Sequence, residues 1–248
     1  MSVKNDAATV ADYAQRVISL KSAKLGEEYF YQSLPLCVID AVYSISVRYA
    51  GVQNVLVRYC NFTKQRRLRA GVRCPSTAQQ ESITAFCSRP EQADPSHMAE
   101  VVYDNRQLTS TKSGILKADA VIQFARCLQS HGVEYFQDVH RIADNTRFDD
   151  DIKNIQGQGS GISLKYFLML AGFDNLIKPD RMVLQFLESA LSRRVKVGEA
   201  SPLLELACEQ LKPRHEHLTP RLLDHEVWKY QRELKVSKAK CKIKVVKS

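Results

Sequence analysis

The sequence predicts an all-α protein with two helical lobes, and three observations lead to that prediction. Apolar residues recur at helical rather than strand spacing along almost the whole chain, and short polar segments separate the apolar stretches. The chain has 248 residues, of which 44% are hydrophobic, so it can bury a sizeable core in one large domain or in two lobes. No internal repeat is present, which argues against a solenoid.

The expected helices follow from this apolar period. In chain order they span 9–20, 38–51, 52–62, 117–132, 133–144, 164–172, 181–191, 199–211 and 219–234. One face of the second helix gathers Val38, Val42, Ile45 and Tyr49, and Gly51 marks its expected end. The stretch 71–114 contains Pro75, Pro90, Pro95 and many small polar residues, which predicts long loops with a few short helices.

This stretch separates two groups of helices and therefore predicts the lobes. One lobe is expected at 115–190, and residues 1–114 together with 191–234 should form the second lobe, with a cleft between the two. The segment 235–248 has six lysines and no acidic residue, which is typical of a basic disordered tail.

Composition excludes several classes of protein. The seven cysteines are scattered and form no CxxC pair, so a disulfide framework or zinc ribbon is disfavoured and reduced cysteines are expected. No apolar stretch has the length of a membrane span, and charged residues interrupt the first twenty residues, where a signal peptide would need an apolar core. We therefore expect a cytoplasmic protein with no membrane partner.

The formal net charge of +9 points to acidic partners. Besides the tail, basic residues cluster in 64-KQRRLR-69 and at Arg193, Arg194 and Lys196. Either cluster could contact phosphate, or simply form a solvated face.

The most informative stretch is 149–187. After a short charged segment, the chain passes through Gly157, Gly159 and Gly161 with Ser160 between the last two, and an apolar helix follows. Glycines allow turns that other residues resist, and bare amides before a helix N-terminus accept anions such as phosphate. The alternative is an αα-corner that uses glycine only to turn.

A second feature lies downstream, where Asp180 follows a proline and precedes a new helix. Together these residues resemble the helix-hairpin-helix DNA glycosylase superfamily, the endonuclease III-like base-excision enzymes. The match comprises Ile155, Gly157, Gly159, the 162–171 helix and Asp180 in the family's order. Weaker similarity extends over roughly 35–190, through 115–125 and the opening core helix at 35–46.

The resemblance implies a two-lobed helical glycosylase fold and a chemistry. Cleavage of an N-glycosidic bond builds positive charge on the sugar, which an ionised Asp180 could stabilise while it orients a water. The hairpin would bind a DNA phosphate through Gly157, Gly159, Ser160 and Gly161, with a monovalent cation as a possible intermediary. Lys165 and Arg181 are secondary phosphate candidates. The alternative for Asp180 is a helix N-cap, a role compatible with catalysis.

Departures from the family narrow the expected activity. Members that also cleave the DNA backbone carry a lysine two residues after the second hairpin glycine, where this chain has Gly161. Only Cys208 and Cys241 follow Asp180, so no iron–sulfur cluster is expected. The family's pocket glutamine has no match, since Ile45 and Ser46 occupy that neighbourhood. The resemblance implies a monofunctional hydrolase of base excision repair, closer to the alkyladenine-type branch.

A flipped base would need a pocket, for which Tyr43, Ser46 and Trp228 are candidates, although aromatic residues at helical spacing are commonly core. His215 and His217 form an HxH pair in a proline-flanked loop, and we expect no metal there. The predicted partner is double-stranded DNA, bound by a monomer. A non-catalytic helix-hairpin-helix DNA-binding protein is the alternative, and a helical protein-interaction domain is a third possibility.

Overall fold

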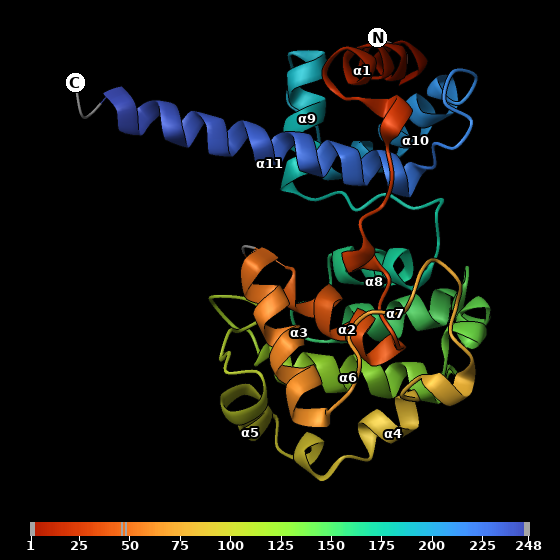
Figure 1. The fold of residues 1–248 in the computed structure, drawn as a ribbon, viewed down its shortest axis with the longest axis vertical. Helices are drawn as coiled ribbons and strands as arrows, with labels where there is room; N and C mark the ends of the chain where they lie inside the picture. The colour runs from red at the N-terminus through yellow and green to blue at the C-terminus, as the bar shows by residue number, and fades with distance from the viewer. Residues whose placement is uncertain (1–2, 46, 48, 246–248) are drawn as a thin grey trace. The chain divides into compact units, whose positions relative to one another are not determined.

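The computed structural model describes residues 3–45, 47 and 49–245, with side chains described as far as Val236 (Figure 1). The all-α prediction is confirmed for these residues, whose only β-pairing consists of two isolated bridges, Tyr31 with Leu68 and Leu108 with Leu116. The chain forms two compact units. Gly26–Gly172 is called the middle unit, and Met1–Leu25 with Phe173–Ser248 is called the terminal unit.

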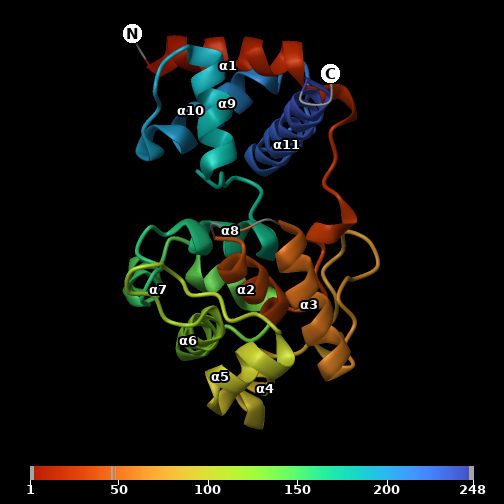
Figure 2. The same cartoon turned by 90° about the vertical axis from the view of Figure 1, so that its left-hand side faces the viewer.

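The middle unit is organised around α2, Leu34–Tyr43, in which every residue is buried. Pro35 lies in its first turn, where the missing N–H has no helical acceptor to lose. The helices packed against α2 are α3 (Tyr49–Thr63), α4 (Ile83–Cys87), α6 (Lys117–Ser130) and α8 (Ile162–Ala171), as Figure 2 shows. A further helix, α7 (Thr146–Asn154), packs on α6.

Shorter elements complete the middle unit. As expected, 71–114 is irregular with a few short helices, namely η3 (Thr77–Gln79), α4, η4 (Pro90–Ala93), α5 (Pro95–His97) and the π-helical η5 (Met98–Val102). The other two short elements are η2 (Glu27–Tyr29) and η6 (Phe136–Ile142).

The terminal unit joins the two ends of the chain. It contains α1 (Val3–Val17), η1 (Leu20–Ser22), α9 (Arg181–Leu191), α10 (Val197–Leu211) and α11 (Pro220–Val245). The α1 helix packs against α9 and α10, and α11 packs against the same two helices. Their shared core includes Val10, Ala14, Phe186, Leu204 and Leu223, all fully buried. Burial of these faces against one another is what stabilises helices of this length.

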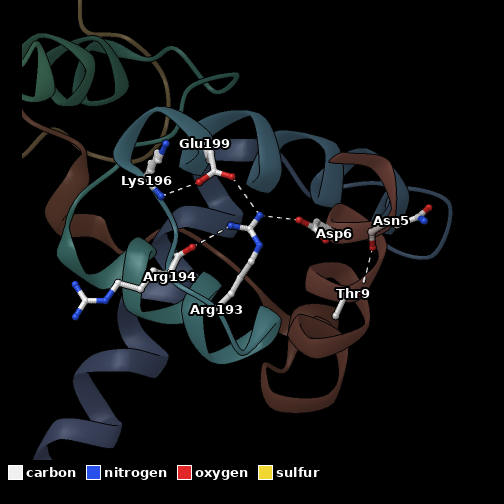
Figure 3. Close-up of polar contacts among 7 residues, drawn as sticks. All are labelled: Asn5, Asp6, Thr9, Arg193, Arg194, Lys196 and Glu199. Atoms are coloured by element: carbon white, nitrogen blue, oxygen red, sulfur yellow. Dashed lines mark hydrogen bonds and ion pairs between the residues drawn. The ribbon is translucent and has the colours of Figure 1, made fainter. Parts of the chain in front are cut away.

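An ion-pair network adds to this packing (Figure 3). The Arg193 Nη2 atom lies 2.6 Å from Oδ2 of the buried Asp6 in α1 and 3.2 Å from Oε1 of Glu199 in α10. Arg193 also donates to the carbonyl of Arg194 at 3.0 Å. The Arg193 guanidinium, which the sequence suggested for phosphate contact, is thus engaged in ion pairs within the chain, although the residue is exposed.

The observed units differ from the expected lobes. The residues 26–114 join 115–172, because α2 and α4 pack on α6. The residues 173–190 join the other unit, because α9 packs on α1 and α11. Long-range pairing of the two chain ends leaves no local pattern in the sequence, and the expected boundaries followed only the loop-rich stretch.

Several helix boundaries also differ from expectation. The break between the second and third helices falls after Tyr43, and Gly51 lies inside α3, where an added Cβ would meet open space. The stretch 133–144 forms the 3₁₀ helix η6 instead of an α-helix. Its Asp138 side chain accepts hydrogen bonds from the backbone N–H groups of Glu134 and Tyr135 at 3.1 and 3.0 Å, which favours a tight turn.

The expected disordered tail at 235–248 is helical as far as it is described, because α11 continues to Val245. Residues 246–248 lie outside the described residues. None of the described helices is both long and apolar enough to cross a membrane.

Candidate functional site

The glycine-rich segment forms a hairpin between α7 and α8 in the middle unit. The α7 helix ends at Asn154, the chain turns through 155–161, and α8 begins at Ile162. Two internal hydrogen bonds close the turn, from the Gln158 N–H to the Ile155 carbonyl at 2.8 Å and from the Gly161 N–H to the Gln158 carbonyl at 2.9 Å. Gln158 is buried, and its side chain accepts a hydrogen bond from Ser163 Oγ in α8. The hairpin is therefore fixed against the helix that follows it.

Glycine is required at two hairpin positions. Gly157 has φ 86° and Gly161 has φ 68°, both in the left-handed region that favours glycine. A Cβ on Gly157 would also lie 2.4 Å from Oγ1 of Thr109, so the hairpin and the 109 loop approach each other closely. Gly159 has no such restriction, since its Cβ would meet only the Lys153 carbonyl oxygen, at 3.7 Å.

The hairpin presents main-chain donors to solvent. Gly157, Gly159 and Ser160 are exposed, and within the described residues no internal acceptor is found for their backbone N–H groups. The N-terminus of α8, which carries a partial positive charge, begins two residues after Ser160. Ser160 Oγ accepts a weak hydrogen bond from the Ile162 N–H at 3.4 Å. This arrangement can accept an anion.

Among the secondary phosphate candidates, Lys165 lies in the first turn of α8 and is half-buried, in the same unit as the hairpin. Arg181 is exposed at the first position of α9 and belongs to the terminal unit. The structure thus brings the glycines, Ser160 and Lys165 together in one unit, and Asp180 and Arg181 together in the other.

Asp180 caps α9 from a tight turn. Its Oδ1 atom accepts hydrogen bonds from the N–H groups of Met182 at 2.7 Å and Val183 at 3.2 Å. Its own N–H donates to the Lys178 carbonyl at 2.7 Å across the buried Pro179. Asp180 is half-buried, and no internal hydrogen bond to its Oδ2 atom is found in the described part of the chain. One oxygen therefore holds the helix and the other stays available.

A second carboxyl group lies close to Asp180. Asp224 of α11 is buried, and its Oδ1 atom accepts a hydrogen bond from the Lys178 N–H at 3.1 Å. Burial, followed by the negative charge of Asp180, holds the pKa of Asp224 well above its usual range. Lys235 also interacts with Asp180 and Arg181, and its Nζ lies 2.9 Å from Met182 Sδ. Asp224 was missed by sequence reasoning because it lies on another helix, outside any motif.

The three base-pocket candidates are placed differently. Tyr43 is buried at the end of α2, with its ring edge-to-face against Tyr103 at 5.3 Å. The Lys117 Nζ lies 5.9 Å from the Tyr43 ring centre and donates to the carbonyls of Tyr43 and Ile45, and burial lowers the pKa of Lys117 to about 8. These contacts place Tyr43 in the core. Ser46 lies outside the described residues.

Trp228 belongs to the terminal unit, on α11. It is half-buried, stacks on His225 with ring centres 6.3 Å apart, and has the Arg232 guanidinium 5.2 Å from its ring centre. Burial lowers the pKa of His225 to about 4, so this imidazole is neutral at neutral pH.

Sequence reasoning also missed a buried carboxylate in α2. Asp40 is fully buried and accepts hydrogen bonds from Tyr31 OH at 2.7 Å, Ser44 Oγ at 2.6 Å and Tyr166 OH at 3.4 Å. Burial and the Asp40 charge raise the pKa of Tyr31 well above its usual range, so this hydroxyl stays a donor. The cluster ties α2 to α8, the helix that follows the hairpin.

Comparison with known proteins gives a family and no named relative. No curated protein and no solved structure matches the chain. A family model described as a domain of unknown function, DUF8548, matches residues 8–232, which include the hairpin, Asp180 and Asp224. The match spans most of both units, and the chain therefore belongs to the DUF8548 family.

Proposed function

We propose that this protein is a monofunctional DNA glycosylase, which flips a damaged or modified base out of duplex DNA and hydrolyses its N-glycosidic bond. The observation that carries the proposal is the Asp180 carboxylate at the head of α9, because its Oδ1 atom caps the helix while its Oδ2 atom takes no part in the cap. The hairpin supports it, because exposed main-chain N–H groups precede α8 and can hold a DNA phosphate.

In the proposed reaction, ionised Asp180 stabilises positive charge on the deoxyribose and orients the attacking water. Hydrogen bonds from Met182 and Val183 hold the carboxylate in one orientation. Burial and the nearby Asp180 charge raise the pKa of Asp224, which favours the protonated form of that neighbouring carboxyl. Gly161 replaces the lysine that a Schiff-base lyase would need, so the attacking group is water.

We also propose where the protein acts and what it binds. The protein would act in the cytoplasm as a monomer on double-stranded DNA, in base excision repair or on modified foreign DNA. It would use no metal or iron–sulfur cofactor, although the hairpin could hold a phosphate through a monovalent cation.

The test uses wild type and Asp180→Asn on a panel of duplexes, each with one modified base, and counts abasic sites by alkaline cleavage. Asparagine is also a good N-cap, so the variant should keep its fold while losing the charge. We expect base release by wild type and a loss of about 100- to 1,000-fold in the variant. Equal release by both proteins would remove Asp180 from catalysis.

A non-catalytic DNA-binding protein is the second candidate. It is favoured by the capping bonds of Asp180, which alone explain an aspartate at that position. Tight, salt-sensitive DNA binding by both proteins, with no abasic sites on any duplex, would favour this candidate.

A further inference from the structure

A basic groove lies in the middle unit, between the end of α3 and η3. Its volume is about 610 Å³, and three arginines line it, Arg66, Arg69 and Arg73. Glutamine side chains and the exposed thiol of Cys74 supply much of the remaining lining. In Figure 2 the loop 65–80 runs beside α3, on the other side of the middle unit from α7 and the hairpin. The groove is therefore separate from the phosphate site proposed at the hairpin.

Arginines outnumber carboxylates in the lining of the groove. Among the described residues that line it, Glu81 is the one carboxylate, and it is already engaged. Its Oε1 atom lies 2.6 Å from Arg89 Nη2, and its Oε2 atom accepts a hydrogen bond from Tyr59 OH at 2.8 Å. Arg66 and Arg73 are exposed and present positive charge to solvent, whereas Arg69 is half-buried and donates to the Tyr31 carbonyl at 3.5 Å.

The walls of the groove are held in place. The Gln80 side chain donates to the Pro75 carbonyl at 2.8 Å and accepts from the Phe136 N–H at 3.1 Å. Gln137 also donates to the Pro75 carbonyl, at 2.8 Å. These bonds fix the 75–80 segment against η6, so a ligand would meet a preformed surface.

Arg69 is oriented by aromatic rings. Its guanidinium carbon lies 5.4 Å from the centre of the Phe30 ring and 5.0 Å from that of Phe136. Stacking on aromatic rings restricts a guanidinium without neutralising its charge, which suits recognition of phosphate oxygens.

The lining favours a sugar–phosphate chain over a small nucleotide. Sites for small ligands are mostly apolar, and nucleobases bind best against aromatic faces. The residues that line this groove are mainly arginines and glutamines, and they include no aromatic side chain. Three arginines along one loop instead offer several phosphate contacts in a row.

We propose that this groove binds the phosphodiester backbone of a DNA strand, as a second contact separate from the hairpin. Arg66 and Arg73 contact phosphate oxygens from the exposed rim, and Arg69 does so from its stacked position. The contact requires DNA binding and no chemistry, so it goes beyond base excision.

The first test measures protection of Cys74. Wild-type protein is treated with N-ethylmaleimide, with and without a short saturating duplex, and alkylation of the Cys74 peptide is followed by mass spectrometry. Among the cysteines whose side chains the structure describes, Cys74 is exposed, Cys87 and Cys127 are half-buried, and Cys37, Cys60 and Cys208 are buried. Following the Cys74 peptide itself keeps the signal specific to the groove. We expect several-fold slower alkylation with DNA, and no slowing with inorganic phosphate at equal ionic strength.

The second test measures how DNA affinity depends on salt. Arg66 and Arg73 are exposed, so Arg66→Gln/Arg73→Gln should fold normally. Each lost phosphate contact makes the slope of log K against log salt shallower by about 0.9, so the slope of the double variant should be shallower by about 1.8. The matched control is Lys21→Gln/Lys24→Gln, which removes two exposed charges in the terminal unit and should keep the wild-type slope.

The outcomes separate this inference from the proposed function. Protection of Cys74 with a shallower slope supports the groove even if no base is ever released. Wild-type slope in the double variant, with Cys74 unprotected by bound DNA, would overturn the groove and leave the glycosylase proposal standing. Equal protection by phosphate alone would show a site for single anions and overturn the strand contact.

Discussion

The hairpin and the head of α9 are the two parts of the candidate site, and they are built from different chemical groups. The hairpin uses main-chain N–H groups, and glycines at positive φ set its shape. The head of α9 uses side chains, with Asp180 beside the buried Asp224 from a helix far along the chain. A backbone site should therefore be insensitive to pH and sensitive to steric change, whereas the side-chain site should show the reverse.

The largest expected loss of stability tests the steric part of this comparison. Gly157→Ala places a Cβ 2.4 Å from Thr109 and holds alanine at φ 86°. We expect the free energy of unfolding to fall by about 2–4 kcal/mol, from overpacking and backbone strain together. Urea unfolding measures this, with Gly159→Ala as the matched control. A loss below that of the control would contradict the close approach of hairpin and loop.

His225 should make the free energy of unfolding depend on pH. Its folded pKa of about 4 lies below the ordinary value of 6.5, so the unfolded chain binds more protons between these values. Stability from this group is present above about pH 6.5 and is lost as the pH falls toward 4, by up to about 3 kcal/mol. Unfolding of wild type and His225→Gln at several pH values checks this. Parallel pH curves for the two proteins would show that folding does not shift the pKa of His225.

Asp224 should change stability with pH in the opposite direction to His225. Its folded pKa is raised, so its stability contribution is full below the unfolded value near 3.8 and is lost as the pH rises. Asp224→Asn should therefore become more stable relative to wild type between acidic and neutral pH. Asp224→Leu removes the acceptor of the Lys178 N–H and should cost about 1–3 kcal/mol. Equal stability of the two variants would mean that this hydrogen bond contributes nothing.

The smallest effect on stability is expected for Gly159→Ala, below about 1 kcal/mol, because its Cβ makes an ordinary contact. The same methyl group would stand between a phosphate and the hairpin amides. DNA affinity, measured by fluorescence anisotropy, should therefore weaken while unfolding barely changes. Unchanged affinity would move the phosphate away from the hairpin.

Much of the fold could be predicted because helical period is a local property. The α9 boundaries, Arg181–Leu191, agree with the expected helix, and α10 and α6 differ by about two residues at one end. The units could not be predicted in the same way, because α1 reaches its partners α9 and α10 only after the whole middle unit has intervened.

The candidate site could likewise be predicted where it depends on local sequence and not where it depends on distant contacts. The glycine spacing predicted the hairpin, because glycine is the residue type that readily adopts the positive φ found there. Asp224 and the Asp40 cluster depend on contacts between distant residues. The groove between α3 and η3 was foreseen in part, because Arg66 and Arg69 belong to the basic cluster 64–69, but its other walls come from the folded structure. The helical spacing of Tyr43 favoured a core position without excluding a base pocket, and its contacts place it in the core.

The most direct test of the central claim separates binding from chemistry. Single-turnover base release is measured at saturating protein for wild type, Asp180→Asn and Gly159→Ala, alongside their DNA affinities. We predict that Asp180→Asn binds as wild type but releases base about 100- to 1,000-fold more slowly, and that Gly159→Ala binds more weakly but reacts normally once bound. A normal rate in Asp180→Asn would show that Asp180 is not the catalytic carboxylate.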